Sequence, residues 1–296
     1  MVREEVLASK QYLSTIGQWP KIPARANPER WLTGFAPEDV DHAVSLLESL
    51  VYFSMEQTTK LCTSLFHSLS EEVSAGQATY ADRKASWSGF VNNCLVTFPT
   101  GETPNPTDSG HTFARLARQE LEIDEARFLY PGDVVQSQYR GQRRPVVMVD
   151  DFAGSGEQFI KTWSRMYPMS DGSQTSFESM ASLAGADVYY IPTVATGYAL
   201  RRIQVAAPSV RLRTAHVLTD RYSAVDPHSV VFPDALRPGA RDFIARASAQ
   251  AGIPSSMELG WHDLALALAF EHSVPDATLP ILWADTPTWN SLLRRS

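Results

Sequence analysis

An acidic pair followed by a loop of small residues is the pattern in this sequence best suited to chemistry. The stretch reads PVVMVDDFAGSGEQ, with Asp150 and Asp151 between the apolar run 146–149 and the loop 154–156. Four consecutive apolar residues, most of them β-branched, predict a strand buried on both faces of a parallel sheet. The loop glycines allow positive φ, so that neighbouring backbone N–H groups converge. A helical pattern follows from residue 157.

Strand, acids, loop and helix start together predict an anion site. A phosphate would bind the loop amides and the helix N-terminus, while the carboxylates hold hydroxyls of the same ligand, which describes a phosphorylated sugar. A nucleotide P-loop is excluded because no Gly-Lys-Ser/Thr follows the glycines. A G-x-S-x-G nucleophile elbow is excluded because Ala153 stands two residues before Ser155. The structural alternative is a buried strand whose last Asp caps the next helix.

The segment resembles the phosphoribosyl-pyrophosphate (PRPP) motif of type I phosphoribosyltransferases, which has four hydrophobic residues, two acids, two variable residues and a Thr/Ser/Gly-rich loop. The resemblance implies that the two acids contact the ribose 2′- and 3′-hydroxyls and that the loop cradles the 5′-phosphate. Asp150 and Asp151 are therefore the expected catalytic residues. The expected ligand-binding positions in this segment are Asp150, Asp151, Phe152, Ala153, Gly154, Ser155, Gly156, Glu157 and Gln158.

Glu157 departs from the family pattern, because many members have Thr at this position. A carboxylate pointing into a phosphate cup would be repulsive. Either Glu157 turns away as a first-turn helix residue, where acids are favoured, or the bound group is not an ordinary 5′-phosphate.

A second segment resembles the family's pyrophosphate-binding loop. The run CLVTF (94–98) predicts a central strand, and a stretch rich in Pro, Gly, Thr and Asp follows at 100–111. The resemblance implies that Thr100, Gly101 and Ser109 bind the pyrophosphate together with Mg²⁺. This Mg²⁺ is expected to be bridged by the ligand, with the acidic pair as its protein carboxylates. The alternative is that Ser109 or its neighbouring Asp only caps the next helix.

A basic segment follows a short strand expected at 127–130. Its sequence PGDVVQSQYRGQRR lies where type I phosphoribosyltransferases carry a mobile loop that closes over the reaction. Tyr139, Arg140, Arg143 and Arg144 could meet phosphates there, and a solvated hairpin is the alternative.

Strands alternate with helices after the acidic motif, with strands expected at 186–194 and 210–218. This rhythm predicts an α/β fold with a doubly wound, mostly parallel sheet, whose ligands bind beyond the carboxyl ends of the strands. Before the sheet we expect an irregular arm over 1–35 and then two helices. The expected domains are an N-terminal arm with a helical subdomain, a phosphoribosyltransferase-like core and a C-terminal extension packed on the core, at residues 1–85, 86–225 and 226–296.

Composition sets the outer bounds. The 296 residues are 44% hydrophobic, enough for one elaborated domain or two closely packed ones. A formal charge of -7 gives no reason to expect nucleic acid on the whole surface. Cys62 and Cys94 are isolated, which favours a reducing cytoplasm. The N-terminus lacks an apolar signal region and no stretch approaches membrane-spanning length, so we expect a cytoplasmic protein with no membrane partner.

Two further elements narrow the resemblance, namely WLxxF at 31–35 and EHxVPxxTLPILW at 271–283. With the acidic motif they resemble phosphoribosyltransferase-like proteins of bacterial conflict systems, including retron-associated ones, over roughly residues 30–294. This implies an antiphage effector that uses PRPP or a related nucleotide in glycosyl-bond chemistry, as a glycosyltransferase or N-glycosidase. Its implied partner is a reverse transcriptase–nucleic acid complex. The alternatives are a catalytically silent nucleotide sensor or toxin subunit and a purine or pyrimidine salvage enzyme.

Overall fold

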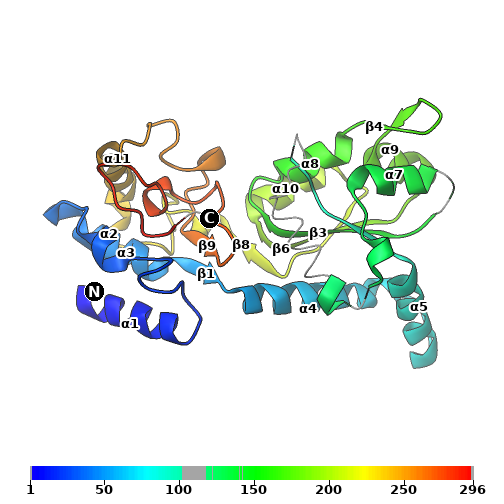
Figure 1. Cartoon of the computed structure of the whole chain (residues 1–296), viewed down its shortest axis with the longest axis horizontal. Coiled ribbons are helices and arrows are strands. Elements are labelled where there is room, and N and C mark those ends of the chain that lie inside the picture. The colour runs from blue at the N-terminus through cyan, green and yellow to red at the C-terminus, as the bar shows by residue number, and fades with distance from the viewer. Residues whose placement is uncertain (1, 102–117, 122, 140, 142, 295–296) are drawn as a thin grey trace. The chain divides into compact units, whose positions relative to one another are not determined.

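The computed structural model describes residues 2–101, 118–121, 123–139, 141 and 143–294. The chain forms two compact units (Figure 1). The sheet unit is Thr58–Val217, and the terminal unit combines Met1–Gln57 with Leu218–Ser296. Within the described ranges, no helix combines the length and the apolar character needed to cross a bilayer.

The sheet unit is built on a parallel sheet in the order β2-β3-β6-β7, with β8 also paired to β6. Its strands are β2 (Leu95–Thr97), β3 (Val146–Ala153), β6 (Val188–Thr196), β7 (Arg211–Leu212) and β8 (His216–Leu218). The pairs β2–β3, β3–β6 and β6–β7 are all parallel. The expected α/β fold with a mostly parallel sheet and an interior strand at 146–149 is confirmed.

Successive side chains of β3 point to opposite faces of the sheet, and apolar clusters cover both faces, so no polar residue interrupts the apolar run. Val146 and Met148 belong to one apolar cluster, with Phe159 and Trp163, whereas Val147 and Val149 belong to another. Figure 1 shows α7, α8, α9 and α10 on one face of the sheet and α4 on the other. Both faces of the strand are therefore buried, as in other doubly wound sheets.

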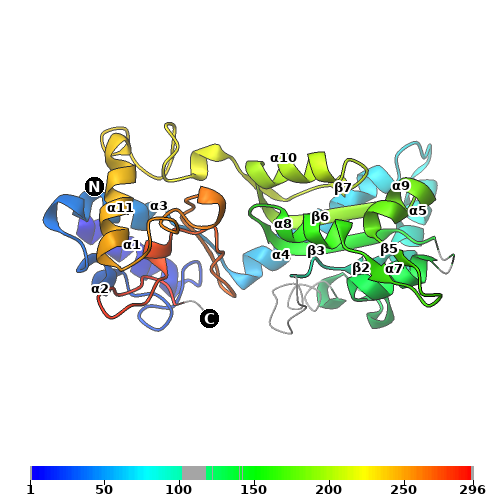
Figure 2. The ribbon, with the colours of Figure 1, turned by 90° about the horizontal axis from the view of Figure 1, so that it is seen from above.

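The remaining elements of the sheet unit are helices and one short hairpin. They are α4 (Met55–Val73), α5 (Tyr80–Asn93), η2 (Glu125–Arg127), α7 (Pro131–Tyr139), α8 (Glu157–Ser164), the antiparallel pair β4 (Tyr167–Pro168) and β5 (Gln174–Thr175), α9 (Phe177–Ala184) and α10 (Gly197–Ala206). In Figure 2, α10 lies alongside β6 and β7.

The terminal unit joins both ends of the chain through one parallel pair, β1 with β9. Its elements are α1 (Arg3–Thr15), α2 (Pro28–Leu32), η1 (Pro37–Asp39), α3 (Val40–Ser49), β1 (Val51–Phe53), η3 (Asp220–Tyr222), η4 (Arg237–Gly239), α11 (Ala240–Gln250), η5 (Trp261–Asp263), β9 (Leu268–Phe270) and η6 (Pro280–Leu282).

The WLxxF element and the TLPILW tail meet inside this unit. The indole N–H of Trp31 and that of Trp289 both donate to the carbonyl of Ile281, each at 2.9 Å. The Phe35 ring packs edge-on against both indoles, with ring centroids 4.7 Å apart for Trp31 and 5.0 Å apart for Trp289. The two segments, about 250 residues apart, form one buried aromatic cluster.

This pairing gives a different division from the one expected at 1–85, 86–225 and 226–296. The C-terminal residues share their apolar core with residues 1–57, because Trp31 and Leu46 pack in one cluster with Phe243 and Leu279. The segment 58–85 belongs instead to the sheet unit.

Several local expectations are corrected. The arm 1–35 is not irregular, since it contains α1 and α2. The sequence did not indicate α1 because only Val6 and Lys10 are buried on it, so its apolar residues show little helical periodicity. The strand expected at 94–98 is shorter and forms β2, which stands at one end of the sheet order and not in its centre. The strand 127–130 is reduced to one bridge between Phe128 and Val96. The strand 210–218 is broken into β7 and β8.

Residues 131–139 are not the mobile loop or hairpin that the polar residues of this stretch suggested. They form α7, because Val134 and Val135 are fully buried on one side of it. Two of the residues expected to meet phosphates are used locally: the Tyr139 hydroxyl donates to Asp171 at 2.8 Å, and Arg144 donates to the carbonyl of Asn93 at 2.6 Å. Arg140 lies outside the described residues.

We predict that Trp31→Ala destabilises the protein by about 3 to 5 kcal/mol, because it empties a fully buried aromatic site. The matched control is Trp261→Ala, since Trp261 is 56% exposed and should lose less than about 1 kcal/mol. Urea denaturation followed by circular dichroism measures both. Equal losses in the two variants would contradict the shared core of the two chain ends.

Candidate functional site

The acidic pair lies within the last residues of β3 and not beyond its end. Asp150 and Asp151 are both buried, because β3 continues to Ala153 and its register with β6 includes Asp150 opposite Pro192. The Asp150 Oδ2 accepts the hydroxyl of Tyr190 at 2.7 Å, and its Oδ1 accepts the backbone N–H of Asp151 at 3.0 Å. Asp150 is thus fixed from two sides by the protein itself.

Burial raises the pKa of two groups at this site, Asp150 and Tyr190. Desolvation, helped by the neighbouring charge of Asp151, raises the pKa of Asp150 well above its ordinary value. Desolvation and the Asp150 charge likewise raise the pKa of Tyr190, so its hydroxyl remains a donor. The Tyr190 ring is stacked on Phe159 of α8 with centroids 4.1 Å apart. The Tyr190 side chain is therefore held with its hydroxyl at hydrogen-bond distance from Asp150.

The loop between β3 and α8 requires a glycine at its last position. Gly156 has a φ of 72° and forms the N-cap of α8. A Cβ there would approach the Ile203 side chain on α10 to 2.9 Å. Both the backbone conformation and the close packing of α10 therefore exclude a larger residue.

The loop carbonyls are held from one side by α10. Thr196 Oγ1 donates to the carbonyl of Gly154 at 2.5 Å, and Arg202 donates to the carbonyl of Ser155 at 2.7 Å. Thr196 also caps α10 by accepting the N–H of Ala199 at 2.9 Å. Among the described residues, no acceptor takes the N–H groups of Gly154, Ser155 or Gly156. Amides in this state, beside a helix N-terminus, are the donors of an anion nest.

Glu157 lies along its own helix. Its carboxylate pairs with Lys161 at 3.0 Å, one turn further along α8, and its N–H donates to Ser155 Oγ at 3.3 Å. The first of the two alternatives for this residue is therefore the one observed, since an acid in the first turn is favoured by the helix dipole.

The start of the expected pyrophosphate loop is tied to α8. The Thr100 N–H donates to Thr162 Oγ1 at 3.0 Å, and Arg165 donates to the Thr100 hydroxyl at 2.8 Å and to the Gly101 carbonyl at 2.6 Å. Gln158 reaches the carbonyl of Pro99 at 3.4 Å. Ser109 lies outside the described residues, so its pyrophosphate role stays a prediction.

One family model matches this chain, the model described as PRTase-CE, over residues 28–295. The chain belongs to the PRTase-CE family. The expected phosphoribosyltransferase-like character is thereby confirmed. No curated protein matches the chain. Because the match runs from α2 through the last described residues, the PRTase-CE region includes most of the terminal unit as well as the whole sheet unit.

Three side chains of this PRTase-CE site were not identified from the sequence, namely Tyr190, Thr196 and Arg202. Thr196 carried a local signal, because a Thr directly before a helix is a typical N-cap. Tyr190 and Arg202 carried none, since their roles depend on which strand lies beside β3 and which helix follows it.

The acids of the PRTase-CE site do not form a metal cage by themselves. In the described part of the chain, no three His, Cys, Asp or Glu side chains gather closely enough to hold an ion. One or two carboxylates with ligand phosphates are nevertheless a usual environment for Mg²⁺. The acidic pair therefore fits a metal that arrives with its ligand.

We predict that Asp150→Asn changes how stability depends on pH. Because the folded pKa of Asp150 exceeds its unfolded value of about 3.9, the native state binds more proton between these two values. Its stabilising contribution is complete below the unfolded pKa and is lost as pH rises through the folded pKa, at up to about 1.4 kcal/mol per pH unit. The free energy of unfolding should therefore fall more steeply with pH in the wild type than in the variant. Urea denaturation at several pH values from about 5 to about 8 measures this. Equal slopes of the free energy of unfolding against pH in the two proteins would contradict the prediction.

We also predict that Gly156→Ala destabilises the protein more than Gly185→Ala does. Both glycines have positive φ, at 72° and 64°, but nothing lies within 4 Å of a Cβ at Gly185. The control should lose about 1 kcal/mol from backbone strain, and Gly156→Ala about 2 kcal/mol or more because Ile203 must move. Thermal or urea unfolding measures the difference, and equal losses would argue against close packing of α10 on the loop.

Proposed function

We propose that the chain binds a ribose bearing a 5-phosphate, either PRPP or a related nucleotide, beyond the end of β3. The supporting observation is the loop 154–156, whose carbonyls are held by α10 while its amides have no acceptor among the described residues. Adjacent N–H groups at the start of an eight-residue helix suit a phosphate monoester.

The acidic pair would hold the ribose hydroxyls, with different shares for its two members. A carboxylate offers about four lone-pair positions, and the protein uses one on each oxygen of Asp150. Asp150 therefore also fixes the strand end, and it keeps about two lone-pair positions for a ribose hydroxyl, which it would hold together with Asp151. Charge-assisted hydrogen bonds of this kind contribute about 1.5 to 3 kcal/mol each.

Mg²⁺ would enter with the ligand's phosphates, and the acidic pair of Asp150 and Asp151 would assist in holding it. The ion would neutralise the charge of a leaving pyrophosphate. The chain's own residues need only hold the sugar, orient the phosphates and exclude water around an oxocarbenium-like state, so no side-chain nucleophile is required. This chemistry is that of a glycosyltransferase or an N-glycosidase.

The biological role we propose is that of an effector in antiphage defence, with a reverse transcriptase–nucleic acid complex as its partner. Its support is the narrower resemblance of the WLxxF element and the TLPILW tail, which lie together through Trp31 and Ile281. Purine or pyrimidine salvage is the weaker alternative, because a compact salvage enzyme has no need of the terminal unit.

A catalytically silent nucleotide sensor is the second candidate. The observation that favours it is the engagement of both Asp150 oxygens by the protein, with the raised pKa of this acid. An acid whose oxygens already accept hydrogen bonds from the protein holds a ligand's hydroxyls less strongly than a free carboxylate.

We predict that Asp151→Asn weakens PRPP binding by at least about tenfold, because it removes a charged acceptor for a ribose hydroxyl. Arg202→Ala should weaken it several-fold, since the Ser155 carbonyl is released and the loop loses its fixed orientation. The matched controls are the exposed residues of the same unit, in Asp133→Asn and Arg83→Ala, which should bind like the wild type. Calorimetry with PRPP, with and without Mg²⁺, measures all five proteins.

Product analysis separates the two candidates. Release of pyrophosphate from PRPP, or of free base from a nucleotide, detected by mass spectrometry and abolished in Asp151→Asn, would establish the enzyme. Binding with no new small molecule would support the sensor. A wild-type protein that binds neither PRPP nor nucleotides would refute both.

A further inference from the structure

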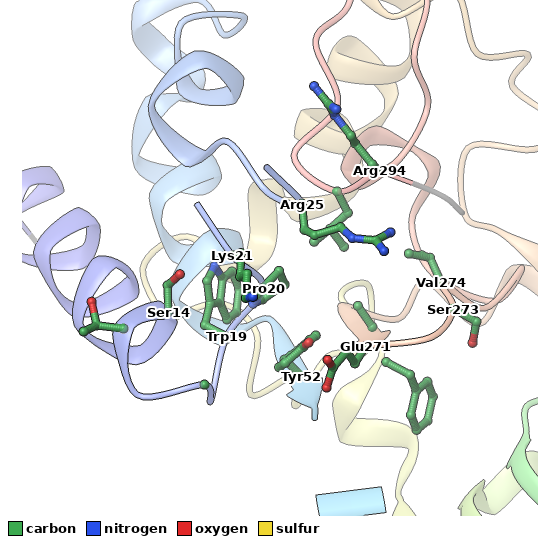
Figure 3. Close-up of a pocket in the computed structure, with 15 residues that line it drawn as sticks. Ser14, Trp19, Pro20, Lys21, Arg25, Tyr52, Glu271, Ser273, Val274 and Arg294 are labelled. Atoms are coloured by element: carbon green, nitrogen blue, oxygen red, sulfur yellow. The ribbon is translucent and has the colours of Figure 1, made fainter. Parts of the chain in front are cut away.

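A pocket lies entirely within the terminal unit. Its volume is about 340 Å³, and its walls come from the end of α1, the turn that follows it, β1, the end of β9 and the last described residues (Figure 3). These segments are far apart in the sequence, but all belong to one compact unit. The acidic motif on β3 contributes nothing to this pocket.

The lining carries an excess of positive charge. Lys21, Arg25 and Arg294 are basic, and Glu271 is the one acid among the lining residues. Within the described part of the chain, none of the three basic side chains makes an ion pair or a side-chain hydrogen bond. Glu271, by contrast, is already held, since its Oε2 accepts the N–H of Met55 at 2.6 Å. Unpaired cations around a concave site indicate an anionic ligand.

A donor that remains protonated lies beside the acid. Burial and the Glu271 charge raise the pKa of Tyr52, and Arg25 opposes this shift only in part. Figure 3 shows Tyr52 next to Glu271, the Arg25 guanidinium extending toward Val274, and Arg294 turned away. Tyr52 and Arg25 line the same pocket with hydroxyl and guanidinium donors, and Glu271 lines it with an acceptor.

Trp19 and its neighbours form an apolar part of the pocket lining. Trp19 is buried, and the Lys10 ammonium lies 4.2 Å from the centre of its ring. That ammonium donates to the carbonyl of Glu48 at 2.9 Å, which ties α1 and the indole to the end of α3. Pro20 lies beside Trp19, and Val274 lines the pocket on the side of Arg25 (Figure 3). The pocket is thus formed before any ligand binds, as ligand sites usually are.

We propose that this pocket binds a small phosphate monoester with a hydroxyl-bearing body, that is, a nucleoside monophosphate or a sugar phosphate. Two basic side chains, Lys21 and Arg25, suit a doubly charged phosphate better than a single carboxylate, and arginine binds phosphate oxygens in pairs. Glu271 and the hydroxyl of Ser273 would accept from the ligand's hydroxyls. The volume is in the range of small-molecule sites. The site is separate from the one proposed on β3 and would make the protein responsive to a second ligand.

Calorimetry on the full chain tests the proposal, with AMP, ribose 5-phosphate and inorganic phosphate as probes. Arg25→Ala should weaken binding of AMP or ribose 5-phosphate by at least about tenfold, and Tyr52→Phe should weaken it several-fold. Arg241→Ala removes the same charge from α11 in the same unit, outside the pocket, and should bind like the wild type. Tighter binding of AMP than of ribose 5-phosphate would identify a nucleotide site, and the reverse a sugar-phosphate site.

Asp151→Asn separates this site from the one on β3. A binding event that Arg25→Ala removes and Asp151→Asn retains belongs to the terminal-unit pocket. The proposal is overturned if Arg25→Ala binds both esters as tightly as Arg241→Ala does. It is also overturned if inorganic phosphate binds as tightly as either ester, or if the wild type binds no probe at millimolar concentration. None of these results bears on PRPP binding at β3, which Asp151→Asn tests by itself.

Discussion

The parallel pairing of β3 with β6 is the constraint on which the rest of the sheet unit depends. Every residue of β6 is buried, and so is every residue of β3 except Phe152. A strand enclosed on both faces requires apolar residues on both, which the run from Val146 to Val149 supplies. The same enclosure continues past the apolar run, so the two acids that follow are desolvated. Asp150 tolerates this because β6 places a phenol within hydrogen-bond distance.

The arrangement of the loop 154–156 depends on the same pair of strands. Because α10 begins directly after β6, its cap Thr196 and its side chain Arg202 reach the loop that follows β3. The loop carbonyls are satisfied from that side, which leaves the amides for another partner. Gly156 is the condition for this closeness, since any side chain there would push Ile203 and its helix away. Sheet order, loop and helix contact are therefore parts of one arrangement.

The terminal unit is a second structure with its own core and its own pocket. Its two halves come from opposite ends of the chain and are joined by the β1–β9 pair and by the aromatic cluster of Trp31, Phe35 and Trp289. The family match covers most of it, so it is a regular part of PRTase-CE proteins. The basic pocket proposed to bind a phosphate monoester lies within this unit and shares no residue with the site on β3.

The sequence by itself determined the elements whose signal is local. Uninterrupted apolar residues indicated β3, the acids and glycines after it located the candidate site, and the alternation of strands and helices indicated a parallel sheet. These predictions needed only periodicity, residue size and backbone freedom. The weakly amphipathic α1 and α5 were missed because few of their residues are buried, and α7 was hidden by its polar exposed face.

Only the tertiary structure decided which residues meet. Tyr190 lies under Asp150 because β6 is the neighbour of β3, and Arg202 holds the loop because α10 returns across it. The chain ends belong to one unit because a strand at residue 51 pairs with one at residue 268. Contacts of this kind depend on strand order and on the packing of distant segments, and neither quantity is encoded in the spacing of neighbouring residues.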